Sequence, residues 1–256
     1  MFNKKTAQAS PVCQVCGKQS HTKYLDSGEY TYYRCKSCGG IFVYPIKPQM
    51  FYLETETYLT NPLQYTSSID PYGQRWMIDQ FERLYKQKMQ QSFLGKKLLE
   101  VGAGVGYLTL FALARGWEAK GIETSKPAVQ FGKDYLRVDL EHATIEGYKT
   151  DEKFDAIVMV EVLEHFLDPL EAIKALRKLS GTQTFLFGTT PNTDSKHWKK
   201  SEQNIYVPDD HIFLFNDSSI RRFADQAGIR DLTIEYFGSG KKHDSNLIYA
   251  GIISDD

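Results

Sequence analysis

The stretch that decides the fold is residues 96–116, KKLLEVGAGVGYLTLFALARG. An apolar run typical of a short buried strand leads into three glycines at alternate positions. A helix-forming segment follows and ends at Gly116, a residue type that often terminates helices. Glycines at such a strand–helix junction let the backbone approach a ligand closely. The stretch therefore predicts a βα unit of a Rossmann-like domain, with a ligand at its glycine loop.

The acids near this loop indicate which ligand it binds. A dinucleotide-binding loop would need a glycine at position 107, where this chain has Tyr107. A carboxylate at Glu100 would repel a pyrophosphate and attract positive charge. S-adenosylmethionine carries a sulfonium and an ammonium group but no phosphate, so it suits this loop. A second acid, Glu123, ends the next expected strand nineteen residues after Gly104, where it can accept both ribose hydroxyls.

The rest of the chain alternates apolar strands with amphipathic helices. We expect helices at 75–94, 106–116, 125–137, 168–180 and 216–229, and strands at 97–103, 117–124, 139–145, within 153–166, 181–192, 230–238 and 245–254. Repeated βα units imply an α/β fold, with a mostly parallel sheet and helices on both faces. The last two strands read as a hairpin.

All four cysteines lie near the beginning of the sequence, as two Cys-x2-Cys pairs. The pairs are Cys13 with Cys16 and Cys35 with Cys38. Two such pairs at this separation favour metal over disulfides, and four thiolates fill the tetrahedral shell of a structural Zn²⁺. The alternative is four free or redox-active thiols. We therefore divide the chain into a zinc ribbon (1–46), a connecting arm (47–74) and a cofactor-binding domain (75–256).

Five stretches together resemble the successive motifs of class I S-adenosylmethionine-dependent methyltransferases. They are LLEVGAGVGYL (98–108), GIETS (121–125), FDAIVMVEVLEHFLDP (154–169), TTPN (189–192) and DDHIFLFNDSSIRRFADQAGI (209–229). The resemblance implies a seven-stranded sheet whose last strand is antiparallel, with the cofactor at the carboxyl ends of the first strands. The ribbon is similar to the N-terminal zinc module that some of these enzymes carry, including C-methyltransferases acting on nucleotide-linked deoxysugars.

The same resemblance implies ten cofactor-binding positions. Glu100, Gly102, Ala103 and Gly104 line the methionine moiety, Glu123 and Thr124 hold the ribose, Thr144 and Ile145 flank the adenine, and Val160 and Glu161 face the methyl group. The segment around Thr144 lacks the aspartate that is usual there.

Two histidines are candidates for removing a proton from the acceptor during methyl transfer. Histidine suits this step because its pKa lies near neutrality. His165 follows the fourth expected strand of the cofactor-binding domain, and His211 stands where the resemblance places a residue that closes the active site. The alternatives are that His165 positions the turn before Asp168, and that His211 is a loop residue packed on neighbouring phenylalanines.

These observations favour a cytoplasmic methyltransferase acting on a small molecule, such as a sugar or another biosynthetic intermediate. One alternative is an RNA methyltransferase that docks through the ribbon, but the net charge of −1 provides no overall basic field for nucleic acid. Another is a module that binds the cofactor without catalysis. The sequence leaves open which acceptor atom, O, N or C, is methylated, and it leaves the oligomeric state open.

Overall fold

The computed structural model describes residues 10–46, 71–195, 211–236 and 246–255. Most of the predicted connecting arm, residues 47–70, lies outside the described residues, and residues 71–74 form the first turn of helix α3 (Pro71–Met89). Within the described ranges, no helix combines the length and apolar character that crossing a membrane requires.

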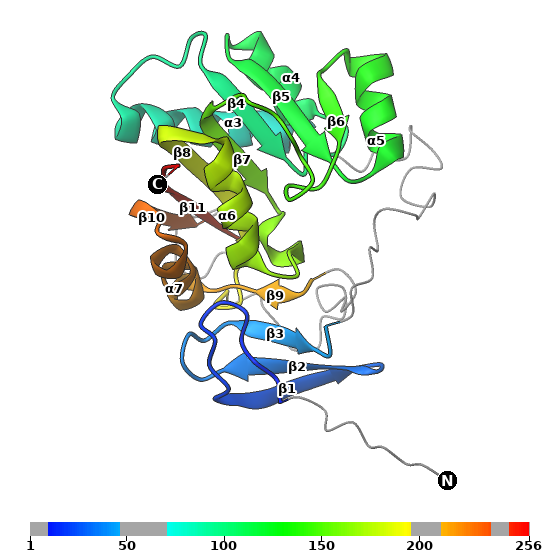
Figure 1. Cartoon of the computed structure of the whole chain (residues 1–256), viewed down its shortest axis with the longest axis vertical. Helices are drawn as coiled ribbons and strands as arrows, with labels where there is room; N and C mark the ends of the chain where they lie inside the picture. The colour runs from blue at the N-terminus through cyan, green and yellow to red at the C-terminus, as the bar shows by residue number, and fades with distance from the viewer. Residues whose placement is uncertain (1–9, 47–70, 196–210, 237–245, 256) are drawn as a thin grey trace.

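A seven-stranded sheet forms the centre of the molecule (Figure 1), in the order β10-β11-β8-β7-β4-β5-β6. Its strands are β4 (Lys97–Val101), β5 (Glu118–Glu123), β6 (Leu140–His142), β7 (Phe154–Val160), β8 (Ser180–Pro191), β10 (Arg230–Tyr236) and β11 (Asn246–Ile253). The strands from β8 to β6 pair in parallel, whereas β11 is antiparallel to both β8 and β10. This arrangement confirms the predicted Rossmann-like fold and its antiparallel last strand.

Helices cover both faces of the sheet. On one face α3 and α4 (Tyr107–Ala114) pack on alternate strand residues such as Leu98 and Phe185. On the other face α6 (Pro169–Leu179) and α7 (Asp217–Ala227) pack on the intervening strand residues, such as Leu99 and Leu186. Burial of side chains on both faces explains why the central strands carry apolar residues at consecutive positions, as in Leu98–Leu99, Ala156–Met159 and Phe185–Phe187.

The helix predicted at 125–137 divides into two parts. Residues Lys126–Phe131 form α5, capped by Ser125, and Gly132–Leu136 form the π-helical turn η2. A Cβ added at Gly132 would lie 2.5 Å from the Val105 carbonyl oxygen, so only glycine allows the widened turn to lie this close to the glycine loop.

A second, smaller sheet lies below the first in Figure 1, in the order β1-β2-β3-β9. Strands β1 (His21–Ser27), β2 (Tyr30–Cys35) and β3 (Ile41–Tyr44) belong to the ribbon, here meaning residues 10–46. Strand β9 (Phe213–Leu214) comes from the segment before α7 and pairs antiparallel with β3. The ribbon and the cofactor-binding domain therefore share a sheet.

Candidate active site and metal centre

The glycine loop follows β4 in a conformation that needs glycine. Gly102, Gly104 and Gly106 all have positive φ angles, of 71°, 54° and 89°. A Cβ at Gly102 would also lie 2.5 Å from Cγ2 of Val162, which follows β7. The amides of Gly102 and Ala103 both donate to the Ile122 carbonyl, at 2.9 and 3.1 Å. The loop is therefore held at the carboxyl ends of β4, β5 and β7, the edge where open parallel sheets bind ligands.

Glu100 lies beneath this loop, and its side chain is only 4% exposed. Its Oε2 accepts hydrogen bonds from the Thr109 amide at 2.8 Å and the Thr109 hydroxyl at 2.5 Å, within the first turn of α4. Burial, with a smaller contribution from the neighbouring charge of Glu123, outweighs the lowering effect of these hydrogen bonds and raises the pKa of Glu100 to about 8. Glu100 thus fixes the start of α4 and can act on a cationic ligand through its charge.

Glu123 ends β5 beside the loop. Its Oε2 accepts a hydrogen bond from the Gly104 amide at 2.8 Å, and its Oε1 accepts one from the Ser125 amide at 2.8 Å and one from the Thr124 hydroxyl at 3.2 Å. The carboxylate therefore joins the glycine loop to the start of α5. This places a half-buried acid at the position where the sequence predicts a ribose partner.

The residues predicted to flank the adenine lie just after β6. Thr144 is half-buried and its carbonyl accepts hydrogen bonds from the Gly147 and Tyr148 amides, which makes a tight turn. Ile145 is buried in the same apolar cluster as Leu99 and Val101. The structure thus brings this turn to the same sheet edge as Glu123, since β6 pairs in parallel with β5.

Glu161 follows Val160 at the end of β7 in a left-handed conformation, with φ of 53°. Its Oε1 accepts a hydrogen bond from the Thr189 hydroxyl at 2.7 Å, and its Oε2 accepts one from the Asn246 side-chain amide at 2.9 Å. Burial raises the pKa of Glu161. A positive φ in a residue other than glycine costs free energy, so the backbone of Glu161 is strained, and the contacts from β8 and β11 hold its carboxylate at the predicted methyl-facing position.

The two candidate histidines come together beside a buried acid. His165 ends the short helix η3 (Leu163–His165), and its ring centroid lies 4.9 Å from that of His211. Glu164 is 1% exposed; its Oε2 accepts a hydrogen bond from the Thr190 hydroxyl at 2.9 Å, and its Oε1 lies 3.9 Å from Nε2 of His165. Burial and the neighbouring charge of Glu161 raise the pKa of Glu164 to about 8. Both histidines are half-buried, so they can exchange protons with a bound acceptor.

Three contributors to this site escaped sequence reasoning: Thr189, Thr190 and Asn246. The two threonines lie in the quoted motif TTPN, where adjacent hydroxyls at a strand end are the only signal. Their side chains point to opposite sides of β8 because strand residues alternate, so one meets Glu161 and the other meets Glu164. Asn246 begins β11 far along the chain, and no local pattern links it to Glu161.

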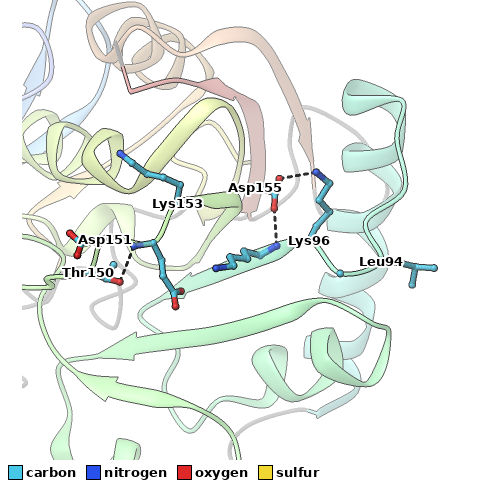
Figure 2. A pocket seen from close by; sticks show the side chains of 9 residues that line it. Leu94, Lys96, Thr150, Asp151, Lys153 and Asp155 are labelled. Carbon is cyan, nitrogen blue, oxygen red and sulfur yellow. Dashed lines mark hydrogen bonds and ion pairs between the residues drawn. The ribbon is translucent and has the colours of Figure 1, made fainter.

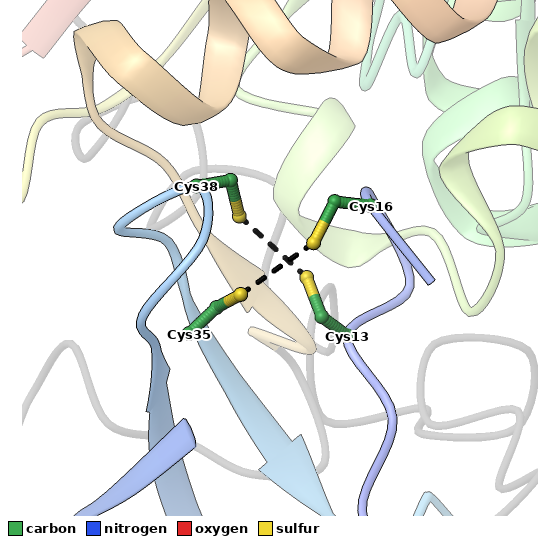
Figure 3. A group of neighbouring side chains, drawn as sticks. All are labelled: Cys13, Cys16, Cys35 and Cys38. Atoms are coloured by element: carbon green, nitrogen blue, oxygen red, sulfur yellow. Dashed lines mark hydrogen bonds between the residues drawn. The ribbon is translucent and has the colours of Figure 1, made fainter. Parts of the chain in front are cut away.

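The four cysteines converge at one point of the ribbon, as Figure 3 shows. Sγ of Cys13 lies 3.6 Å from Sγ of Cys38, Sγ of Cys16 lies 3.5 Å from Sγ of Cys35, and all four sulfurs lie within 4.8 Å of one another. A tetrahedral zinc with Zn–S bonds of about 2.3 Å separates its sulfurs by about 3.8 Å. The four thiols are unbridged and close to this geometry, so they fit a structural zinc.

Metal analysis of the purified chain is expected to return one zinc per molecule. The double substitution Cys35→Ser with Cys38→Ser should abolish zinc binding and lower the melting temperature by several degrees or more, since zinc binding contributes folding free energy. Inductively coupled plasma mass spectrometry and calorimetry measure the two effects. A fully folded, metal-free preparation with the same melting temperature would contradict the structural role.

An open hollow lies at the opposite edge of the sheet, near the first residues of β4 and β7 (Figure 2). Its walls carry charges of both signs, and Asp155 there binds Nζ of Lys96 at 3.0 Å and the Lys97 amide at 2.9 Å. These paired charges tie β7 to β4. The hollow is therefore separate from the glycine loop and the histidines.

The sheet order, the acid-flanked glycine loop and the polar groups at the end of β7 define a class I S-adenosylmethionine-dependent methyltransferase fold. Residues 73–234 match a family described as a methyltransferase domain, and the chain belongs to that family. This confirms the resemblance inferred from the sequence motifs.

Relatives with curated names include O-methyltransferases of ubiquinone biosynthesis. The one from Pasteurella multocida is 30% identical over 148 residues, which cover 50% of this chain and 61% of the relative. The one from Alkalilimnicola ehrlichii is 34% identical over 111 residues, covering 41% of this chain and 45% of the relative. The match thus spans about three fifths of the first relative's length.

Solved structures share the fold at low identity. The plantazolicin methyltransferase BpumL in complex with SAH superposes with a TM-score of 0.61 at 14% identity, covering 80% of this chain and 93% of that one. A SAM-dependent methyltransferase from Archaeoglobus fulgidus superposes with a TM-score of 0.54 at 13% identity, covering 68% of this chain and 94% of that one.

Proposed function

We propose that this chain transfers a methyl group from S-adenosylmethionine to a hydroxyl of a small-molecule acceptor. The observation that carries the proposal is the meeting of His165 and His211, 4.9 Å apart, beside the end of β7 and its contact with the glycine loop. The O-methyltransferase names of the relatives from ubiquinone biosynthesis support a hydroxyl acceptor rather than the sugar carbon considered from the ribbon alone.

The residues of this chain divide the work of binding between them. Gly102 lets the glycine loop lie directly against Val162, since a Cβ there would come within 2.5 Å of the Val162 side chain, and Glu123 and Thr124 would receive the ribose hydroxyls. Thr144 and Ile145 would flank the adenine, and Val160 and Glu161, at the end of β7, would face the methyl group. When bound, S-adenosylmethionine supplies a methyl carbon that its sulfonium activates.

The histidines perform the proton step. One imidazole accepts the proton of the acceptor hydroxyl as that oxygen becomes the nucleophile, and the second ring and the ionised form of Glu164 stabilise the resulting positive charge. Glu164 suits this role because its Oε1 makes no hydrogen bond within the described residues and lies 3.9 Å from Nε2 of His165.

The affinity for S-adenosylmethionine is expected to rise about threefold or more between pH 7 and pH 8. The pKa of Glu100 is raised to about 8, so the carboxyl holds a proton below that pH, and a cationic ligand binds better once the proton has left. S-adenosylhomocysteine, which lacks the sulfonium charge, should show a weaker trend. Isothermal titration of the wild type and Glu100→Gln measures this, because the substitution should reduce the slope. Equal affinity at both pH values would refute it.

The proposal as a whole is tested by incubating the chain with S-adenosylmethionine and a panel of hydroxylated small molecules, and reading a mass increase of one methyl group. Structured RNA in a parallel reaction tests the alternative acceptor. Tight cofactor binding with no methylated product from any small molecule, or methylation of RNA alone, would overturn it.

A further inference from the structure

The ribbon reaches the candidate active site through the shared sheet. Strand β3 pairs with β9, with Ile41 opposite Leu214 and Phe42 opposite Phe213. The pairing continues one residue toward the N-terminus of β9, where the Val43 amide donates to the Ile212 carbonyl at 3.1 Å. In Figure 1, β9 lies between the ribbon strands and the rest of the cofactor-binding domain. His211 therefore directly precedes a segment that the ribbon holds.

The peptide unit between His211 and Ile212 is bound at both of its edges. The His211 carbonyl accepts a hydrogen bond from the Tyr32 hydroxyl of β2 at 3.3 Å. The Ile212 amide donates to the Glu164 carbonyl of η3 at 2.8 Å. Because the C=O and N–H of a trans peptide point in opposite directions, one rigid plane connects the ribbon with the helix that carries His165.

Apolar packing holds the same junction. Ile212 and Leu214 are buried in one cluster with Tyr30, Tyr32 and Val43. Phe213 packs so closely on Gly40 that a Cβ there would lie 2.3 Å from its ring, two residues after the proposed zinc ligand Cys38. The cysteines also belong to the apolar cluster that includes Phe213 and Phe215. The residues around the proposed metal site therefore pack directly against β9.

We propose that the zinc ribbon is a positioning element of the active site, in which Tyr32 fixes the His211 peptide so that the imidazole faces His165. Tyr32 acts through His211 and is a positioning residue. This inference rests on the proposed function only in giving His211 a catalytic role; the placement of the ring can be measured without turnover.

The substitution Tyr32→Phe removes the hydroxyl and keeps the ring, and Tyr33→Phe is its matched control. Tyr33 lies on the same strand, and its ring packs on His21 and Phe42. Tyr32→Phe is expected to lower kcat about three- to tenfold, as for loss of one hydrogen bond, with unchanged affinity for S-adenosylhomocysteine. Tyr33→Phe should leave both values at the wild-type level.

The second readout is the NMR signal of the His211 ring, assigned by its loss in His211→Gln. Tyr32→Phe, and separately removal of zinc from the wild-type chain with a chelator, should shift this signal and its titration midpoint; adding zinc back should restore them. The His142 signal, at the far edge of the sheet, serves as reference. If Tyr32→Phe impairs folding, removal and re-addition of zinc in the wild-type chain still test whether the ribbon positions His211.

An unchanged His211 signal after zinc removal, or equal effects of Tyr32→Phe and Tyr33→Phe, would overturn the inference. If instead His211→Gln keeps full turnover while Tyr32→Phe and zinc still move the His211 signal, the ribbon positions His211 and the catalytic assignment of His211 fails. The two proposals therefore fail separately.

Discussion

Replacing His211 with alanine is expected to lower kcat by a factor of about 10² to 10⁴, the usual contribution of a general base, while the affinity for S-adenosylhomocysteine stays within about twofold. The His211 ring lies beside His165, with ring nitrogens of both within 4.8 Å of a Glu164 carboxyl oxygen, and the His211–Ile212 peptide is held by Tyr32 and the Glu164 carbonyl. Loss of the imidazole therefore removes a proton acceptor without removing the contacts that keep the loop in place. Steady-state kinetics and isothermal titration measure the two quantities.

The matched control for this experiment is His211→Gln, which preserves polar character but cannot take up a proton near neutral pH. It should be as slow as the alanine variant and should lose the acidic limb of the pH–rate profile. His165→Ala is expected to cause a comparable loss if the two rings share the proton. Normal kcat in both alanine variants would remove the histidines from the base role, and a loss in only one would assign the base to that ring.

Replacing Glu123 with alanine is expected to weaken binding of S-adenosylmethionine by about ten- to a hundredfold. The carboxylate accepts hydrogen bonds from the amides of Gly104 and Ser125, so its loss frees the glycine loop as well as removing the proposed ribose partner. Hydrogen bonds to a charged group are worth about 1.5–3 kcal/mol each, which sets this range. Glu123→Gln keeps the shape of the side chain and one acceptor oxygen. Its affinity for S-adenosylmethionine should lie between those of the wild type and Glu123→Ala.

A thermodynamic cycle separates the two roles of Glu123. Wild type and Glu123→Ala are each titrated with S-adenosylhomocysteine and with its 2′-deoxy analogue. If the carboxylate binds the ribose, the missing hydroxyl should cost affinity in the wild type and little in the variant. Equal costs in both would restrict Glu123 to holding the loop, and a variant that binds the cofactor normally would rule out both roles.

The sequence predicts well the features that depend on neighbours along the chain. The spacing of Gly102, Gly104 and Gly106 after an apolar run predicts the loop, because positive φ angles and close backbone approach are local demands on residue type. The two Cys-x2-Cys pairs predict the metal ligands because their spacing is a local signal, whereas the contacts of Cys13 with Cys38 and of Cys16 with Cys35 come from the fold of the ribbon. The helix caps at Ser125 and Asp168 are likewise local hydrogen bonds.

By itself, then, the sequence determined the alternation of strand and helix and the position of the glycine loop, and it predicts the zinc ligands; each follows from residue type and spacing within a short segment. Only the tertiary structure decided that Glu100 bonds to Thr109, that Asn246 reaches Glu161, and that β9 leaves its own domain to complete the ribbon sheet. The last two contacts join segments far apart in the chain, and the first joins a strand to the helix that follows it. These contacts depend on the order of the strands and on the face of the sheet to which each side chain points. A sequence pattern within one segment predicts neither the strand order nor these pairings.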